Sequence, residues 1–162
     1  SSYSLINSEV DSRYVNLKYL DDKEFIFFTN YNSPKAAAFN SHDQITALIY
    51  WSSINVQIRI KAQIKKTSKE FNQKYFYERS KKKNALAISS NQSEQIDSYS
   101  KVKENYNLVL KNHDLKECPD YWGGFSFIPY YFEFWEGDDS RINKREVFEK
   151  SDGRWICSFL QP

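Results

Sequence analysis

The sequence predicts a mainly β fold of the α+β class, a barrel or sandwich of short strands with two or three helices packed on it. Residues 55–65, NVQIRIKAQIK, alternate strictly between apolar and polar side chains, which is typical of a half-buried antiparallel strand. Other β-rich runs are separated by turn-prone clusters such as DDKE, EGDDS and SDGR. Many short strands at such spacing favour a barrel or a sandwich.

The remaining strands follow from the same local pattern. We expect them at residues 2–7, 13–20, 24–30, 46–51, 124–135, 145–150 and 154–160.

Three segments break the strand pattern and predict helices. In SPKAAAF, Ser33 is the expected N-cap and Pro34 the first helical residue. The second helix lies in residues 67–80, where Thr67 and Glu70 have capping-box spacing.

The third helix is expected in residues 97–112, which carry apolar side chains at helical spacing. The lysine run 81–83 is expected to be a solvated loop, because a run of like charges is more often solvated than part of a site.

Length and charge bound the function. The 162 residues are near the usual size for one hydrophobic core, so we expect a single domain over residues 1–162. The net charge of +2 is too small to favour a nucleic-acid or acidic-membrane partner. Two cysteines and two histidines at no metal-ligand spacing indicate no metal and a reduced, cytoplasmic setting. No apolar run approaches the ~20 residues that span a bilayer, and no signal peptide is visible.

The stretch EFWEGDDSRINKR, residues 133–145, gathers chemistry-bearing side chains. If residues 141–145 form an extended strand, Arg141, Asn143 and Arg145 point to one face. Two guanidiniums on one face favour an anionic or aromatic ligand across them, because like charges side by side repel. The alternative is a solvated edge whose acidic residues screen the arginines.

Three further local patterns each allow two interpretations. The helix that starts at Ser33, with Lys35 in its first turn, suits a phosphate, but an ordinary surface cap has the same pattern. Tyr75 and Arg79, four residues apart on a helix, either converge on an anion or form a packing pair. Gln57 lies on the polar face of its strand, toward a ligand or toward solvent.

Eight words, read in order, resemble the pyridoxine (pyridoxamine) 5′-phosphate oxidase family, whose fold is the FMN-binding split β-barrel. They cover essentially the whole chain, and the part from 119 to 162 resembles the family's dimerisation region. The words are RYVNLK (13–18), FFTNYNSPKA (27–36), YWSSINVQIRI (50–60), KYFYERS (74–80), NQSEQI (91–96), YWGGF (121–125), FEFWEG (132–137) and SRINKR (140–145).

The resemblance implies FMN as the cofactor, bound at the interface of a homodimer. By position, the residues implied for the FMN phosphate and ribityl chain are Arg13, Lys18, Thr29, Ser33 and Lys35. Those implied for the flavin ring and its polar edges, largely from the partner subunit, are Phe28, Gln57, Gln92, Ser93, Trp135 and Arg145.

The resemblance also implies a substrate site. Lys18, Tyr75 and Arg79 hold the substrate phosphate, with Lys83 in the same pocket. Arg141 is the implied catalytic residue that faces the substrate ring, and Asn143 lies beside it. Since Arg13 and Lys18 are an odd number of residues apart, they serve different parts of the site unless a bulge intervenes.

Four departures from the family pattern bear on the activity. Asn143 stands where the family has a histidine, Pro34 replaces a basic residue of the FMN site, and Lys83 replaces a small hydroxyl residue. Ser1 lies nearly at the first strand, whereas the oxidases have a longer N-terminal segment that helps to close over the substrate.

The function implied is oxidation of pyridoxine or pyridoxamine 5′-phosphate to pyridoxal 5′-phosphate, with dioxygen as the acceptor. Asn143 leaves open a relative that acts on another ring compound, as phenazine-biosynthesis members of the fold do. A non-catalytic flavin or pyridoxal-phosphate carrier is a further alternative. An OB-like nucleic-acid barrel would explain the Tyr and Lys residues of 65–83 but not the near-neutral charge.

Overall fold

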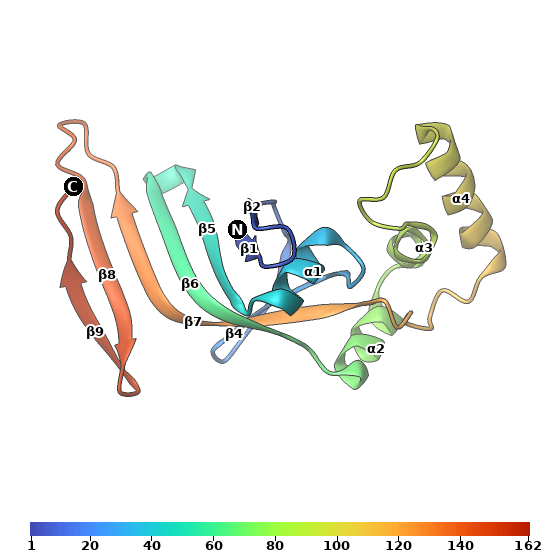
Figure 1. The fold of residues 1–162 in the computed structure, drawn as a ribbon, viewed down its shortest axis with the longest axis horizontal. Coiled ribbons are helices and arrows are strands. Elements are labelled where there is room, and N and C mark those ends of the chain that lie inside the picture. Colours follow the sequence, from blue (N-terminus) through green and yellow to red (C-terminus); the bar gives the residue numbers. More distant parts are fainter.

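The computed structural model describes residues 1–162 and confirms the mainly β prediction, with nine strands in one antiparallel sheet (Figure 1). The strands are β1 (Ser2–Ser4), β2 (Glu9–Asp11), β3 (Leu17–Asp21), β4 (Glu24–Asn30), β5 (Gln44–Trp51), β6 (Val56–Lys66), β7 (Trp122–Glu136), β8 (Lys144–Ser151) and β9 (Arg154–Phe159). The helices are α1 (Pro34–Ser41), α2 (Lys69–Glu78), α3 (Lys81–Ser89) and α4 (Tyr99–Asn112), with a 3-10 turn at Ser52–Ile54. None of these helices combines the length and the apolar composition that crossing a membrane would require.

Strand β7 divides the sheet into two halves. It pairs with β6 along most of its length, with β4 at residues 122–127 and with β8 at residues 131–136. The main path of the sheet is β2-β1-β5-β6-β7-β4-β3, and β8 with β9 branches from the far half of β7. The hairpin β8–β9 therefore lies at one end of the long axis, and helices α2, α3 and α4 lie at the other end (Figure 1).

A proline marks the place where β7 changes partner. Lys61 pairs with Tyr131 and Ala62 with Pro129, so Tyr130 has no opposite residue on β6. Proline cannot donate to the ladder and is tolerated in sheets at such bulges, which bend the strand. The bend falls between the segments of β7 that pair with β4 and with β8.

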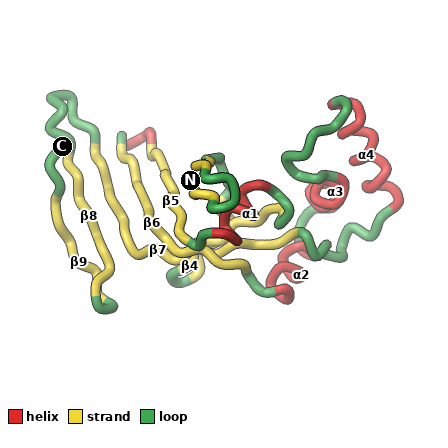
Figure 2. The backbone as a smooth tube through the Cα atoms, in the orientation of Figure 1, coloured by secondary structure: helices red, strands yellow, loops and turns green.

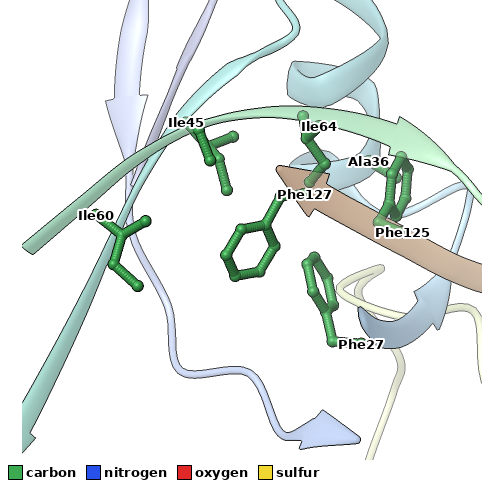
Figure 3. Close-up of a cluster of buried hydrophobic side chains, with 8 residues drawn as sticks. Phe27, Ala36, Ile45, Ile60, Ile64, Phe125 and Phe127 are labelled. Carbon is green, nitrogen blue, oxygen red and sulfur yellow. The ribbon is translucent and has the colours of Figure 1, made fainter. Parts of the chain in front are cut away.

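The core lies where β4, β5, β6 and β7 meet helix α1 (Figure 3). The predicted alternation of residues 55–65 is confirmed, because Ile60, Ala62 and Ile64 are buried while Gln63 and Lys65 are exposed. Burying each isoleucine contributes roughly 1.5–3 kcal/mol. The cluster consists of Phe27, Ala36, Ile45, Ile60, Ala62, Ile64, Phe125 and Phe127.

Of the two predicted helix caps, the position of Ser33 before Pro34 is confirmed and the cap of α2 needs correction. Ser33 occupies the N-cap position of α1, but its hydroxyl makes no capping bond and donates instead to Asn30 O at 2.7 Å. In α2 the cap is Ser68, whose Oγ accepts from Phe71 N at 3.2 Å, so the capping box from Thr67 is wrong. Thr67 is held elsewhere, because its hydroxyl bonds Gly124 O at 3.1 Å.

The expectation of a loop at residues 81–83 is also wrong, and the fold has four α-helices rather than two or three. The three lysines form the exposed first turn of α3. The helix is anchored by a polar residue, since Asn84 Nδ2 donates to Phe76 O and to Leu115 O, both at 2.7 Å.

The extended strand expected over residues 141–145 is a third correction. Strand β8 begins only at Lys144, and Arg141 has a left-handed backbone with φ of 65°. Asp138 draws the segment into a turn, because it accepts from Ser140 N at 2.9 Å and its own N–H donates to Asn143 Oδ1 at 3.1 Å. Arg141 and Arg145 therefore share no strand face.

Candidate functional site

The first part of the site is a buried lysine that has no acidic partner. Lys35, in the first turn of α1, is only 5% exposed. Its Nζ donates to Ser33 Oγ and to Gln92 Oε1, both at 3.1 Å. Gln92 Oε1 also accepts from Thr29 Oγ1 at 2.9 Å and from Asn30 N at 3.3 Å. Three donors from β4 and α1 thus converge on one oxygen, as they would on an oxygen of an anion.

Electrostatics favour an anion at this place. Burial, with a smaller contribution from the positive charge of Arg13, lowers the pKa of Lys35 to about 8. No side chain caps α1, but Pro34 has no N–H and the amides of Ala36 and Ala37 already donate to Ser33 O, so the first turn leaves the Lys35 N–H at the positive end of the helix dipole. A buried cation at a helix N-terminus suits a phosphate group. We call Thr29, Ser33, Lys35 and Gln92 the lysine cluster.

Arg13 and Lys18 are both exposed, and of the two it is Arg13 whose charge acts on Lys35. Arg13 lies before β3 and forms an ion pair with Asp11. Lys18 sits at a bulge in β3, between the register positions of Leu17 and Tyr19. Because Arg13 and Lys18 are an odd number of residues apart, the sequence left open whether a bulge lies between them or they serve different parts of the site. The structure has a bulge at Lys18.

The second part of the site is a stack of aromatic rings with an arginine. The Phe28 ring stacks on Tyr75, with centroids 3.8 Å apart, and on Trp122 at 5.2 Å. Arg79 at the end of α2 lies over Trp122, with Cζ 4.4 Å from the ring centroid. We call Phe28, Tyr75, Arg79 and Trp122 the arginine cluster.

One nitrogen atom of the Arg79 guanidinium lacks a hydrogen-bond partner. Its Nη1 is buried and has no hydrogen-bond partner, and burial lowers the pKa of the guanidinium. A buried unpaired N–H costs about 1–3 kcal/mol and is rare in native proteins. The packing interpretation is confirmed, since Arg79 packs on aromatic rings, and the anion interpretation stays a prediction, for which the unpartnered Nη1 is available. The nearest ring belongs to Trp122 and not to Tyr75, which is 6.0 Å away.

The third part of the site lies on the other half of the sheet. Gln57 on β6, Trp135 on β7 and Arg145 on β8 are direct neighbours in register, so their side chains share one face. Arg145 is held on this face by Glu133, to which its Nε and Nη2 donate at 2.9 and 2.8 Å. We call Gln57, Trp135, Arg145 and Glu133 the strand cluster.

The chain does not bring all the predicted residues together. Gln92 belongs to the lysine cluster rather than with Gln57 and Trp135, and Ser93 beside it is exposed with φ of 75°. Lys83 is exposed on α3. Arg141 and Asn143 lie in the β7–β8 loop, far along the molecule from the helices that carry Tyr75, Arg79 and Lys83 (Figure 2). The predicted site residues of one chain therefore fall into two separated groups.

Sequence reasoning missed two residues of the site. Trp122, which Arg79 covers, opens β7 within the word YWGGF. Glu133 is 3% exposed and bonds two arginines. Strand alternation could have identified Glu133, because it lies two residues before Trp135 and opposite Arg59.

Comparison with known proteins finds one family. The model of the pyridoxine 5′-phosphate oxidase C-terminal dimerisation region matches residues 122–162. The pyridoxine/pyridoxamine 5′-phosphate oxidase of Leptospira biflexa is 34% identical over 165 residues, which are 99% of this chain and 78% of that protein. The enzyme of the same name from Rhodopirellula baltica is 30% identical over 167 residues, 99% of this chain and 75% of its own.

Two solved structures share the fold. The structure of PhzG from Burkholderia lata 383, in complex with tetrahydrophenazine-1-carboxylic acid, has a TM-score of 0.91 at 24% identity and covers 99% of this chain and 79% of its own. A pyridoxamine 5′-phosphate oxidase-related, FMN-binding protein from Nostoc punctiforme has a TM-score of 0.76 at 14% identity, with coverages of 99% and 85%. These likenesses confirm the split β-barrel that the eight sequence words implied.

Proposed function

Because the chain belongs to the pyridoxine/pyridoxamine 5′-phosphate oxidase family, whose cofactor is FMN, we propose that it oxidises pyridoxine or pyridoxamine 5′-phosphate to pyridoxal 5′-phosphate with dioxygen. One observation carries the proposal. Lys35 and Arg79 are sheltered cations in separate clusters, and neither forms a salt bridge. Two anion sites in one chain match two ligands that each bring a phosphate, the cofactor and the substrate.

The residues of the lysine cluster fit the FMN phosphate. Lys35 supplies the charge, Thr29 and Asn30 supply donors that already converge on one oxygen, and the start of α1 adds the Lys35 N–H. The polar edges of Gln57 and Arg145 and the ring of Trp135 fit a flavin ring.

FMN, when bound, would supply the chemistry, which is acceptance of a hydride from the 4′ carbon of the substrate and reduction of dioxygen to hydrogen peroxide. The hydroxyl proton of pyridoxine 5′-phosphate would pass to solvent, and pyridoxamine 5′-phosphate would also take up water and release ammonia. The chain's own residues bind and orient. Arg79, with Tyr75 and Lys18, holds the substrate phosphate, and Arg141 holds its ring. Such positioning converts an encounter into an aligned reaction and requires no acid or base from Asn143.

The complete site forms between two copies of the chain. The lysine and arginine clusters lie toward the helical end, whereas the strand cluster and Arg141 lie toward the β8–β9 end (Figure 1). Large apolar side chains are also exposed at the ends of strands β5 and β9, including Trp51 at 57% and Phe159 at 67%. A second copy would cover these side chains and join the two half-sites, which supports a two-fold homodimer.

Oxidation of another ring compound is the alternative, and Asn143 favours it. An amide cannot carry the charge or shuttle the proton of the family's histidine, and its Oδ1 already accepts from Asp138 N at 3.1 Å. Arg79 distinguishes oxidation of a phosphorylated substrate from oxidation of another ring compound. A substrate without a phosphate would leave its Nη1 without a partner.

The test is to load the purified protein with FMN and to measure pyridoxal 5′-phosphate formed from pyridoxine 5′-phosphate in air. Many turnovers per site are expected. No product from a protein that visibly holds flavin would overturn the proposed reaction and move the function to another ring substrate or to a flavin carrier.

A further inference from the structure

Glu133 lies at the centre of a buried polar network on the strand cluster. Its Oε1 accepts from Arg145 Nε at 2.9 Å and Nη2 at 2.8 Å. Its Oε2 accepts from Arg59 Nε and from the Tyr131 hydroxyl, both at 3.0 Å. One carboxylate thus binds two guanidiniums and a phenol while remaining 3% exposed.

The network explains how a carboxylate can stay ionised in this place. Burial opposes ionisation of Glu133, but the bonds from Arg59, Arg145 and Tyr131 outweigh it and hold the pKa below its usual value. With two arginines for one carboxylate, the network keeps a net charge of about +1 on the face of Trp135.

The network also fixes the direction of Arg145. Three of its nitrogen atoms are engaged, because Nη1 donates to Gln161 O at 2.8 Å while Nε and Nη2 bind Glu133. A guanidinium has five N–H groups, so two remain free, one on each terminal nitrogen. Arg145 is therefore held at three nitrogen atoms and still has two N–H groups for a ligand.

We propose that Glu133 is a positioning residue for FMN, which it serves by holding Arg145 with two N–H groups free, while Arg59 offsets the charge of the carboxylate so that the network as a whole stays positive. The inference rests on the proposed function only in taking FMN as the ligand of Arg145. Nothing in it depends on which substrate is oxidised. A guanidinium fixed before binding loses less conformational entropy when the ligand arrives.

FMN affinity, measured by flavin fluorescence quenching without substrate, tests the role of Glu133. Glu133→Gln keeps the shape of the side chain and removes its charge, so Arg145 loses its anchor. We expect Kd to rise about 10- to 100-fold, the usual cost of losing the residue behind a ligand-binding group. A Kd within about twofold of the wild-type value in the folded variant would overturn the proposal.

A double-mutant cycle separates positioning from a general structural role. If Glu133 acts through Arg145, Glu133→Gln adds little further loss of FMN affinity in an Arg145→Ala background. Additive losses would mean that Glu133 merely supports the sheet, and would overturn the proposal. This readout is affinity, so it stays informative if pyridoxine 5′-phosphate proves not to be the substrate.

Arg59→Gln is the matched control variant, because Arg59 binds Oε2 of Glu133 whereas Arg145 binds Oε1. It also tests the proposal if Glu133→Gln fails to fold. It removes a guanidinium from Glu133 but leaves the Arg145 bonds in place. We expect FMN affinity to fall only about threefold, far less than in Arg145→Ala. A loss as large as that of Arg145→Ala would overturn the assignment of Glu133 to Arg145.

Discussion

Arg79 lies over the ring of Trp122, with its Cζ 4.4 Å from the ring centroid and its Nη1 buried without a partner. The tryptophan holds the guanidinium in place by a cation–π contact while leaving this nitrogen free. A charge that is ordered, sheltered and unpaired is a costly feature unless an anion completes it. Under the proposed function, Arg79 is therefore the residue that distinguishes a phosphorylated substrate from one without a phosphate.

We therefore predict that Arg79→Met raises KM for pyridoxine 5′-phosphate about 10- to 100-fold, because a charge-assisted hydrogen bond contributes roughly 1.5–3 kcal/mol. FMN affinity should not change, since Arg79 makes no contact with the lysine cluster. Steady-state kinetics and a flavin titration measure the two effects. Lys82→Ala, on the exposed first turn of α3, is the control for loss of one positive charge. An unchanged KM in Arg79→Met would exclude Arg79 from the phosphate site.

A second prediction concerns the pH dependence of FMN binding. Lys35 has a pKa lowered to about 8, so it loses its proton as the pH rises through that value. The affinity for FMN should fall across this range because the phosphate then meets a neutral amine. Riboflavin, which has no phosphate, should bind with no such dependence. Equal pH profiles for the two flavins would show that Lys35 does not meet the phosphate.

The same lowered pKa predicts a trade between stability and binding. The folded protein disfavours the protonated amine, so the cost is fully present below about pH 8 and disappears as the pH rises toward 10.5, the usual value for lysine. Lys35→Met should raise the free energy of unfolding at pH 7 by on the order of 2 kcal/mol and weaken FMN binding. Urea denaturation without FMN, at pH 7 and at pH 10, measures the first effect. A destabilised variant at pH 7 would contradict it.

The sequence predicted the sheet well because strand alternation is a local signal. Residues 55–65 show it directly, and burial of Ile60, Ala62 and Ile64 follows. Helix α3 was missed because its sequence has no apolar stripe at helical spacing. The helix is anchored instead by Asn84, which donates hydrogen bonds to the carbonyls of Phe76 and Leu115. Its three lysines gave a pattern that is equally typical of a loop.

The site residues were predictable in identity but not in grouping. Gln92 joins Thr29 and Lys35 through contacts that span 63 and 57 residues, which no local pattern records. The choice between Thr67 and Ser68 as the cap of α2 was likewise decided by a distant group, the Gly124 carbonyl that binds Thr67. Tertiary contacts of this kind override short-range preference.

A fourth prediction distinguishes the two arginines of the segment from 141 to 145. Arg145 is fixed on the strand cluster by Glu133, so Arg145→Ala should weaken FMN binding. Arg141 lies in the exposed turn before β8, so Arg141→Ala should spare FMN binding and lower kcat for pyridoxine 5′-phosphate. Flavin titration and turnover with saturating FMN separate the effects. The reverse pattern would show that the roles of this segment are exchanged.

The last prediction concerns the assembly of the site. If the lysine cluster of one copy meets the strand cluster of the other, chains with Lys35→Ala and chains with Arg145→Ala are each defective alone. A mixed dimer regains one intact site, because one subunit supplies Lys35 and the other supplies Arg145. Random pairing at equal amounts should restore about one quarter of the FMN sites, half of the dimers having one of two sites intact.

This complementation is measured by flavin content after the two variants are unfolded together and refolded, with each variant refolded alone as the control. Light scattering on the same samples should give the mass of two chains, against 19.3 kDa for one. A monomer that binds FMN at full occupancy would contradict the shared site. So would a mixture that regains no flavin while remaining dimeric, because both halves of the site would then come from the same chain.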